Sequence, residues 1–313
     1  MSERIVNILV TGGAGFIGSH LCEALLAKKH NVICVDNLGS GDAKNIQHLL
    51  QNKNFLFIKH DIINSLQIDG KIDQIFHLAS RASPIDYQQY PVETALSNAI
   101  GTHNLIKLTL EKNAVLLFSS TSETYGDPLQ HPQKETYWGN VNPIGIRSCY
   151  DESKRFGEAL LMAYSREYKA KIKIIRIFNT YGPRMRKDDG RVIPNFITQA
   201  LANKPITIYG DGKQTRSFCY VDDLIAGIIK MMDSKEIGPV NLGNPKEFTM
   251  IELANMVKKL TNSKSEIVFK QLPEDDPTRR CPDISVAKKV LSWEPKVELE
   301  DGLKRTTQWF KEN

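Results

Sequence analysis

The 313-residue sequence lacks the hallmarks of several large protein classes. It contains no run of 18 apolar residues, so we expect no membrane-spanning helix and no membrane partner. Its five cysteines, an odd number, include no pair at metal-ligand spacing, which argues against a disulfide framework and against a bound metal. The first residues show no secretory-signal pattern, so we expect a protein of the reducing cytosol.

Strong charge of one sign is also missing. The formal net charge is +5, and 25% of the residues are charged. No basic run carries interleaved aromatic residues, so nucleic acid is not an expected partner. The mild basic excess suits an anionic small molecule. With 41% hydrophobic residues, the chain is long enough for a substantial core and for two lobes.

The first half of the sequence alternates short apolar runs, rich in β-branched residues, with helical patterns. Amphipathic stretches over 16–29 and 94–112 predict helices. Apolar strands separated by helices predict an α/β fold with a doubly wound parallel sheet, whose ligands bind beyond the carboxyl ends of the strands. The predicted strands are residues 7–12, 31–36, 55–61, 74–80, 114–120 and 173–179.

The composition of the sequence changes after about residue 180. Segments 181–191 and 272–283 are rich in proline, glycine and charge, and helical patterns occur at 192–204 and 250–262. We therefore predict a Rossmann domain over residues 1–180, with a return segment at about 214–236, and a smaller substrate-binding lobe over residues 181–313.

The segment TGGAGFIG (11–18) follows a predicted strand and opens a predicted helix. Gly12 permits a tight turn, Gly15 lets the backbone approach a pyrophosphate, and Gly18 lets the helix pack on the strand. Asp36 ends the second strand and favours NAD over NADP, because a carboxylate there binds the ribose 2′-hydroxyl and repels a 2′-phosphate. The predicted cofactor-binding residues are Gly12, Gly15, Phe16, Ile17, Gly18, Asp36, Asn37, Asp61, Ile62, Leu78, Ala79, Tyr150 and Lys154.

Tyr150 and Lys154 stand four residues apart in a predicted helix, so their side chains share one face. A free tyrosine has a pKa near 10 and is a poor base at neutral pH. A neighbouring ammonium, with the positive charge of an oxidised nicotinamide, favours the phenolate. Lowering the pKa by three units corresponds to about 4 kcal/mol. We therefore predict that Tyr150 is a catalytic base tuned by Lys154.

The segment SSTSETYG (119–126) follows the apolar run 114–118, although ordinary turns favour Gly, Asn, Asp and Pro. Together with the glycine triplet and the Tyr150/Lys154 pair, it resembles the extended short-chain dehydrogenase/reductases that modify nucleotide sugars. The resemblance implies that Thr121 hydrogen-bonds the sugar 4-hydroxyl. It also implies that Tyr150 removes the proton of this hydroxyl as C4 is oxidised by NAD, and that Lys154 contacts the nicotinamide ribose.

A finer resemblance, to the UDP-glucuronate decarboxylases (UDP-xylose synthases), covers nearly the whole chain. It is carried by the segments 121–154, 176–196, 209–224 and 239–245. The sequence departs from the usual residues of that family at Thr124, Ser153 and Cys281, where Val, Gly and Lys are usual.

The triplet Thr121–Ser122–Glu123 distinguishes among the reactions of these families. In the related 4,6-dehydratases, the middle residue is an aspartate that protonates a departing 6-hydroxyl, a role that Ser122 cannot fill. The 4-epimerases generally lack the glutamate. The resemblance therefore implies NAD-dependent decarboxylation of UDP-glucuronate to UDP-xylose, through oxidation at C4, loss of CO₂ and re-reduction.

The resemblance also implies roles for residues in the second half of the chain. Arginine matches phosphate with two parallel hydrogen bonds, which suits a diphosphate ligand. The implied catalytic residues are Tyr150, Lys154, Thr121, Glu123, Ser122 and Arg216. The implied substrate-binding residues are Asn179, Arg191, Tyr209, Gln214, Arg216 and Arg280.

Several alternatives remain open at this point. Within the family they are a nucleotide-sugar 4-epimerase, a 4,6-dehydratase, and a decarboxylase that stops at the 4-keto sugar or also forms apiose. A non-catalytic NAD(H)-binding regulator belongs to another class, but such proteins commonly lose the catalytic tyrosine or lysine. Members of the family usually pair as homodimers, here through the helical stretches 94–112 and 150–168.

Overall fold

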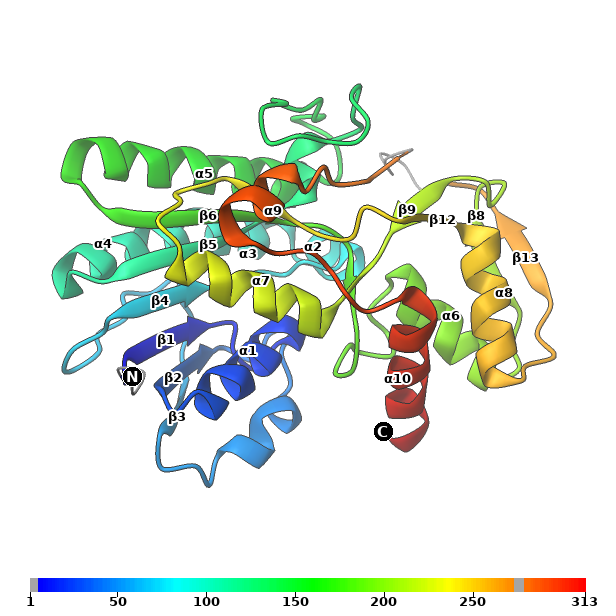
Figure 1. Ribbon diagram of the computed structural model, residues 1–313, viewed down its shortest axis with the longest axis horizontal. Helices are drawn as coiled ribbons and strands as arrows, with labels where there is room; N and C mark the ends of the chain where they lie inside the picture. The colour runs from blue at the N-terminus through cyan, green and yellow to red at the C-terminus, as the bar shows by residue number, and fades with distance from the viewer. Residues whose placement is uncertain (1–4, 273–278) are drawn as a thin grey trace.

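A seven-stranded parallel sheet forms the centre of the computed structural model, which describes residues 5–272 and 279–313 (Figure 1). The strand order is β11-β6-β5-β4-β1-β2-β3, and every neighbouring pair is parallel. This order, which reverses between β1 and β4, confirms the predicted doubly wound α/β fold. The strands are β1 (Asn7–Thr11), β2 (Asn31–Asp36), β3 (Phe55–Lys59), β4 (Gln74–His77), β5 (Val115–Thr121), β6 (Lys171–Ile177) and β11 (Val240–Leu242).

Helices cover both faces of this sheet because successive side chains of a strand point to opposite faces. On β1, the buried Ile8 and Val10 belong to a core cluster that includes the helices on one side of the sheet, while Leu9 belongs to a separate cluster with the helices on the other side. The apolar character of the whole strand, noted in the sequence, follows from this double burial. The helices are α1 (Phe16–Ala27) and α7 (Val221–Asp233) on one side, and α4 (Thr102–Lys112) and α5 (Ser148–Tyr168) on the other.

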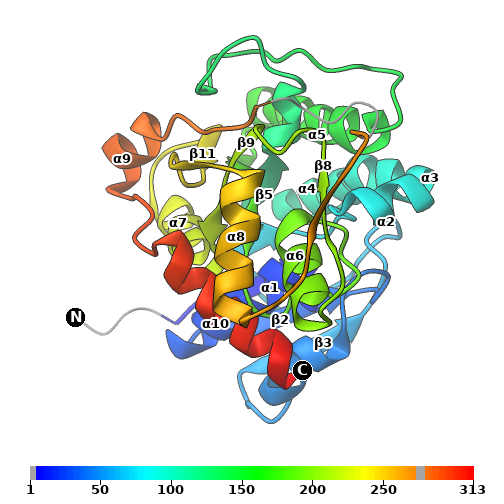
Figure 2. The ribbon, with the colours of Figure 1, turned by 90° about the vertical axis from the view of Figure 1, so that its right-hand side faces the viewer.

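The second half of the chain supplies a group of helices and short strands beside the sheet (Figure 2). Helices α6 (Val192–Leu201), α8 (Met250–Thr261) and α10 (Leu299–Glu312) pack on one another. Strand β8 (Ile206–Tyr209) pairs in parallel with β13 (Ile267–Lys270), and β9 (Thr215–Ser217) pairs antiparallel with β12 (Glu247–Thr249). The domain boundary at residue 180 stays a prediction. The chain does return to the main sheet, through α7 and β11.

The helix predicted over 94–112 is divided. The structure has α3 (Pro91–Leu96), a π-helical turn at Ser97–Gly101, and then α4. Within this turn, the buried Asn98 donates a hydrogen bond to Ser153 Oγ of α5 at 2.9 Å. A Cβ on Gly101 would lie 2.5 Å from Ile62 Cδ1. Hydrophobic periodicity does not reveal such contacts with distant segments, so the wider turn could not be predicted from the sequence.

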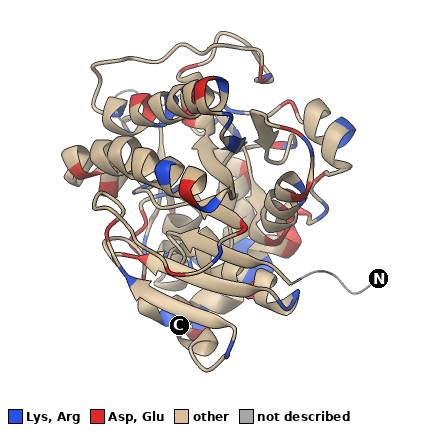
Figure 3. Cartoon of the chain, turned by 90° about the vertical axis from the view of Figure 1, so that its left-hand side faces the viewer, with Lys and Arg blue, Asp and Glu red and all other residues tan. Residues whose placement is uncertain are grey.

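The remaining elements connect these layers. They are 3₁₀ turns at η1 (Ala43–Leu49) and η3 (Ser122–Tyr125), helices α2 (Pro84–Gln89) and α9 (Ser285–Leu291), and the paired strands β7 (Thr180–Tyr181) and β10 (Cys219–Tyr220). In the part of the chain that the structure describes, no helix has the length and apolarity needed to cross a membrane. Basic and acidic residues are interspersed over the elements seen in Figure 3.

Candidate active site

A cleft opens beyond the carboxyl ends of the main-sheet strands. Its walls come from segments spread from Gly12 to Arg191. All of the residues predicted to bind the cofactor line it. So do five residues assigned to catalysis or to the substrate, namely Thr121, Ser122, Glu123, Asn179 and Arg191. The fold therefore brings the predicted cofactor residues and part of the predicted chemical site to one place.

The turn between β1 and α1 exposes bare backbone to the cleft. Gly12 has a φ of +72°, and a Cβ there would lie 2.7 Å from the backbone nitrogen of Ala79. A Cβ on Gly18 would lie 2.0 Å from the carbonyl oxygen of Gly12. Only glycine fits these two positions. The turn ends at the N-terminus of α1, where free N–H groups and the helix dipole favour a phosphate.

Asp36 lies at the end of β2, beside the glycine turn. Its Oδ2 accepts a hydrogen bond from the backbone N–H of Ala14 at 3.0 Å, and its Oδ1 accepts one from Leu38 at 2.8 Å. Burial raises the pKa of Asp36, and the two backbone hydrogen bonds oppose this rise. Further along the cleft, Asn37 Nδ2 donates to Asp61 Oδ2 at 2.9 Å. A carboxylate beside a glycine cradle fits the adenosine diphosphate half of NAD.

The hydroxyl-rich end of β5 and the turn that follows it have two roles: some side chains stabilise the fold and others line the cleft. Ser119 Oγ donates to the carbonyl at the end of β4 at 2.9 Å, and Ser120 Oγ donates to Glu158 Oε1 of α5 at 2.5 Å. Thr121 Oγ1 then accepts a hydrogen bond from the backbone N–H of Glu123 at 3.2 Å, which caps the turn η3. The hydroxyls anchor the strand end, and the turn carries Thr121 to Glu123 along the cleft.

Tyr150 lies in the first turn of α5 with its ring buried. The ring stacks on that of Tyr87, with centroids 5.2 Å apart and planes 4° from parallel. Burial raises the pKa of Tyr150 to about 12, although a hydrogen bond with the Thr121 side chain acts in the opposite direction. The protein's own residues therefore keep this phenol protonated at neutral pH.

Lys154 follows one helical turn later and is 1% exposed. Its Nζ donates a hydrogen bond to the carbonyl oxygen of Ser119 at 2.8 Å. The same nitrogen lies 5.9 Å from the centroid of the Tyr150 ring and 4.8 Å from that of Phe118. Burial lowers the pKa of Lys154 to about 7, while the nearby Glu158 carboxylate opposes this shift. The pair thus lies on one helix face, as its spacing predicts.

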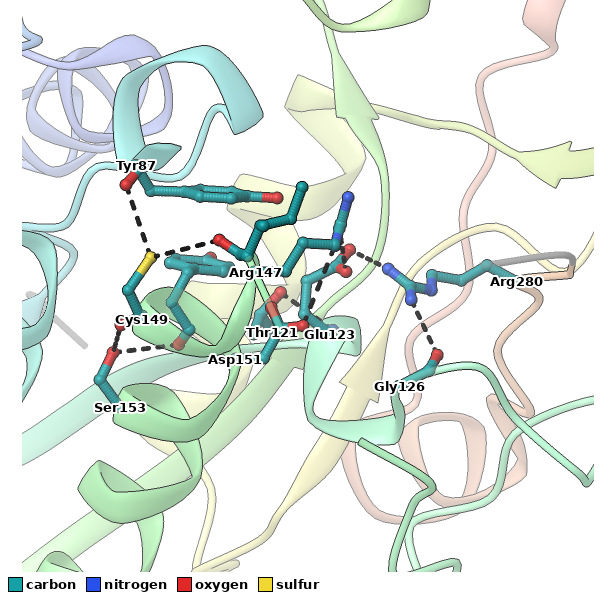
Figure 4. Close-up of polar contacts among 11 residues, drawn as sticks. Tyr87, Thr121, Glu123, Gly126, Arg147, Cys149, Asp151, Ser153 and Arg280 are labelled. Atoms are coloured by element: carbon teal, nitrogen blue, oxygen red, sulfur yellow. Dashed lines mark hydrogen bonds and ion pairs between the residues drawn. The ribbon is translucent and has the colours of Figure 1, made fainter. Parts of the chain in front are cut away.

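Glu123 is held between two arginines (Figure 4). Its Oε2 forms an ion pair with Arg147 Nη2, and its Oε1 forms one with Arg280 Nη1. Arg280 also donates from Nη2 to the carbonyl oxygen of Gly126 at 3.0 Å. Burial lowers the pKa of Arg280 to about 10, so it still carries its charge at neutral pH. The negative charge of Glu123 is therefore compensated by two guanidinium groups.

Two further arginines on the cleft wall are paired with carboxylates. Arg191 forms a fork with Asp189, with Nε–Oδ1 and Nη2–Oδ2 distances of 2.5 and 2.7 Å. Burial raises the pKa of Asp189, but the charge of Arg191 outweighs it and holds the pKa below its usual value. Arg186 Nη2 lies 2.8 Å from Asp86 Oδ1. These carboxylates fix the directions of the guanidinium groups along the wall.

Four residues with a predicted role lie outside the lining of this cleft. Tyr209, at the end of β8, is 44% exposed and accepts a hydrogen bond at its carbonyl from the Gln214 side chain. Arg216 of β9 donates from Nη1 to the carbonyl of Thr215 at 2.9 Å. Arg216 and Arg280 are paired in an isolated β-bridge. Because Arg280 also forms the ion pair with Glu123, it connects the strand of Arg216 to the cleft.

Other residues line the cleft but were not predicted. The residues Ser80 to Ser83 follow the end of β4, so the rule that ligands meet strand ends could have found them. Asp86 and Asp189, the partners of the arginines, carry no local signal. The unpredicted polar lining residues include Ser40, Asn45, His60, Ser80, Arg81, Ser83, Asp86, Glu93, Ser97, Thr180, Arg184, Arg186 and Asp189.

Known proteins resemble this chain over nearly all of its length. UDP-glucuronic acid decarboxylase 4 of Arabidopsis thaliana is 51% identical over 312 residues, which cover 100% of this chain and 70% of that protein. UDP-glucuronic acid decarboxylase 1 of Danio rerio is 50% identical over 304 residues, covering 97% and 72%. A crystal structure of UDP-glucuronic acid 4-epimerase from Bacillus cereus, in complex with UDP-glucuronic acid and NAD, superposes with a TM-score of 0.88. It has 31% sequence identity and covers 98% of this chain and 99% of that one.

Residues 8–243 match the model of the NAD dependent epimerase/dehydratase family. The matched range contains the glycine turn, the Thr121–Ser122–Glu123 triplet and the Tyr150/Lys154 pair, and it ends before Arg280. The chain therefore belongs to the NAD dependent epimerase/dehydratase family and, within it, groups with the UDP-glucuronic acid decarboxylases.

Proposed function

We propose that this chain is an NAD-dependent UDP-glucuronate decarboxylase that forms UDP-xylose. The observation that carries the proposal is the triplet Thr121–Ser122–Glu123, which lines the same cleft as Tyr150 and Lys154. The 51% identity to a UDP-glucuronic acid decarboxylase over the whole chain supports it.

Tyr150 accepts the proton of the sugar 4-hydroxyl, and Thr121 hydrogen-bonds this hydroxyl. The phenol is hydrogen-bonded to the Thr121 side chain, and its ring is fixed by the stack on Tyr87. To accept a proton as a base, Tyr150 needs its pKa lowered from about 12, which a nearby cation achieves. NAD, when bound, supplies the electron acceptor for C4 and a positive charge on the nicotinamide.

Lys154 contributes in two ways. Its hydrogen bond to the Ser119 carbonyl uses one of the three N–H groups of the ammonium, which leaves the others for ribose hydroxyls. Its charge lies 5.9 Å from the Tyr150 ring centroid and favours the phenolate form of Tyr150, the form that deprotonates the sugar 4-hydroxyl.

The chemistry of the substrate explains why oxidation at C4 precedes the loss of CO₂. UDP-glucuronate oxidised at C4 is a β-keto acid. When the bond between C5 and the carboxylate breaks, its electron pair moves into the C4 carbonyl, so an enolate forms rather than an unstabilised carbanion. The enolate is then protonated at C5, and C4 is reduced again. The two electrons removed first are returned last, so the reaction has no net redox change.

The triplet suits a substrate with a 6-carboxylate. Ser122 carries no charge, whereas an aspartate at that position would meet the carboxylate with like charge. Glu123 carries one, but Arg147 and Arg280 compensate it. We assign to Glu123 the task of positioning these two guanidinium groups, with Arg216 as a further cation on the sugar side.

The UDP moiety would lie along the wall that carries Asn179 and Arg191. The fork with Asp189 holds the Arg191 guanidinium in a fixed direction, which favours bidentate contact with phosphate. Tyr209, Gln214 and Arg280, on adjoining segments, remain assigned to the substrate within this proposal.

Assembly and location are part of the same proposal. We assign a homodimer formed through the stretches 94–112 and 150–168, because Ile100 of the π-helical turn and Phe156 of α5 are exposed hydrophobic side chains there, with Val92 of α3 exposed beside them. The free thiol state of all five cysteines is consistent with a cytosolic location.

A 4-epimerase acting on UDP-glucuronate is the second candidate. The observation in its favour is the TM-score of 0.88 with the Bacillus cereus enzyme. The two activities differ in product mass, since epimerisation keeps the carboxylate and decarboxylation removes it.

The test is incubation of the purified chain with UDP-glucuronate and NAD, followed by mass spectrometry and NMR of the product. Decarboxylation gives a UDP-pentose with the xylose configuration. In D₂O, that product carries one deuterium at C5. An isomer of unchanged mass would favour the epimerase. Unchanged UDP-glucuronate with intact NAD binding would favour the non-catalytic regulator.

A further inference from the structure

Three side chains that commonly bind metals meet outside the active-site cleft. They are His131, Glu247 of β12 and Cys281, and their ligand atoms lie within 4.8 Å of one another. His131 Nε2 is 2.8 Å from Glu247 Oε2. Because the three residues are more than thirty positions apart in the sequence, spacing motifs cannot detect this cluster.

Backbone contacts hold the three segments together without any help from the cluster. The N–H of Gln133, two residues after His131, donates to the carbonyl of Cys281 at 2.9 Å. In return, the N–H of Cys281 donates to Gln133 Oε1 at 2.9 Å. Glu247 is fixed by the pairing of β12 with β9, opposite Ser217. The fold therefore places the backbone of the three ligand residues near one another before any ion binds.

The surroundings of the cluster also suit a metal site. Thr215 Oγ1 donates to Glu247 Oε1 at 2.5 Å, which leaves Oε2 directed at His131. Such outer contacts orient ligands in known metal sites. The residue Cys281 is only 4% exposed, whereas the side chains of His131 and Glu247 are 30% and 25% exposed. Because His131 and Glu247 are partly exposed, water could supply a fourth ligand.

We propose that His131, Glu247 and Cys281 form a Zn²⁺ site with one position open to water. A thiolate, an imidazole and a carboxylate are typical Zn²⁺ ligands. The two anionic ligands and the neutral imidazole balance the charge of the ion. Zinc bond lengths of about 2.0–2.3 Å place tetrahedral ligands about 3.3–3.8 Å apart. Side-chain rotation would separate His131 from Glu247 and bring Cys281 Sγ, now hydrogen-bonded to the Pro245 carbonyl at 3.3 Å, toward them.

The site adjoins two cations assigned to the substrate. Arg280 directly precedes Cys281, and its guanidinium contacts Glu123 in the cleft. Arg216 lies on β9, paired with Phe248 next to Glu247. A bound Zn²⁺ would cross-link the segment of Arg280 to β12 and to the loop of His131. It would thereby restrain both arginines.

The test uses the full chain, stripped of metal with a chelator and titrated with Co²⁺. We expect one equivalent to bind, with the thiolate-to-cobalt absorption and the intense visible bands of four-coordinate cobalt, and we expect Zn²⁺ to displace it. C281S should abolish the thiolate band, and H131Q should weaken Co²⁺ binding at least ~10-fold. C149S removes a free thiol of α5 that is not part of the cluster; it is the matched control and should bind as the parent does.

Two further measurements separate a metal site from a folding defect. H131Q changes a partly exposed side chain, so its fold, checked by circular dichroism, should be intact while its affinity falls. Zn²⁺ should raise the Tm of the parent and of C149S but not that of C281S. The proposal is overturned if Co²⁺ gives no thiolate band, or if the band survives in C281S.

Discussion

Tyr87 stacks face to face on Tyr150, with ring centroids 5.2 Å apart. The two rings come from α2 and α5, and the buried Tyr87 hydroxyl has no hydrogen-bond partner among residues 5–272 and 279–313. The ring of Tyr87 therefore supports the ring of Tyr150, while the Tyr150 hydroxyl is hydrogen-bonded to the Thr121 side chain. This relationship fixes the direction of the Tyr150 ring.

Replacing the Tyr150 hydroxyl should remove most of the activity. Because general base catalysis contributes 10²–10⁴-fold, we expect Tyr150→Phe to lower kcat at least ~100-fold. The ring and its stack on Tyr87 remain, so NAD binding should change little. Turnover is measured as UDP-pentose formed per minute, and NAD affinity by calorimetry.

Tyr87→Phe is the matched control for that variant. It keeps the stacked ring and removes a buried hydroxyl without a partner, so activity and stability should stay close to those of the parent. A Tyr150→Phe enzyme that retains more than about a tenth of the parent kcat would contradict the role of Tyr150 as the base.

Lys154 should make the stability of the protein depend on pH in a definite direction. Burial lowers its pKa to about 7 in the folded protein, against about 10.4 for an unfolded lysine. Between these values the unfolded chain binds more protons, so the contribution of this residue to the free energy of unfolding rises with pH. Its slope is at most about 1.4 kcal/mol per pH unit.

The measurement is urea unfolding of the parent and of Lys154→Met from pH 6 to pH 10. The methionine variant has no charge to desolvate, so it should be the more stable protein at pH 6, and the difference should shrink as the pH rises. Two curves that run parallel over this range would show that Lys154 keeps its proton in the folded state.

Asp36 should decide between the two forms of the nicotinamide cofactor. Asp36→Asn keeps an oxygen for a backbone hydrogen bond but loses the negative charge. Since a hydrogen bond to a charged group contributes about 1.5–3 kcal/mol, we expect the Kd for NAD to rise at least ~10-fold, and the preference over NADP to shrink.

Asp42→Asn is the control for Asp36→Asn. Asp42 lies in the loop after Asp36, outside the cleft lining, and caps the turn η1 through the N–H of Lys44. It should leave the ratio of the two Kd values unchanged. An Asp36→Asn protein that discriminates against NADP as strongly as the parent would assign the selectivity to another group.

Glu123 should be important for stability as well as for activity. Arg280 has a side chain that is 4% exposed, and losing its partner leaves a buried charge. Breaking a buried ion pair costs about 3–5 kcal/mol, so we expect Glu123→Ala to destabilise the protein by about that amount. Glu123→Gln, which keeps an acceptor oxygen, should cost less. The free energies are measured by urea unfolding.

An exposed pair provides the comparison. Glu300 lies 3.5 Å from Lys259, and both side chains are more than half exposed. Glu300→Gln should change the free energy of unfolding by less than about 1 kcal/mol. If Glu123→Ala were no more destabilising than Glu300→Gln, the two arginines would not depend on Glu123 for charge compensation.

The parts of the site that could be predicted from the sequence are those encoded by a short segment. The turn at Gly12 and Gly18 needs residues without a Cβ, and Tyr150 and Lys154 share a face because of helix geometry. Asp36 could be placed because it ends an apolar strand. In each case, a few residues close in the sequence determine both the local structure and the chemistry.

The parts that could not be predicted depend on contacts between distant segments. Arg147 meets Glu123 only because the loop before α5 folds back over the turn after β5. The carboxylate partner of Arg186, Asp86, is 100 positions away. The stack of Tyr87 on Tyr150 is likewise set by how α2 packs on α5. No periodicity or spacing in the sequence encodes such pairings.

The position of β11 in the chain has a consequence for synthesis on the ribosome. β11 pairs with β6, although 62 residues separate the end of one from the start of the other. Until the segment ending at Leu242 has left the ribosome, the edge of β6 that pairs with β11 has no neighbouring strand. An unpaired strand edge is a template for association with another chain. The nascent polypeptide therefore passes through a stage in which shielding of that edge, by a chaperone or by the growing chain itself, protects it from aggregation.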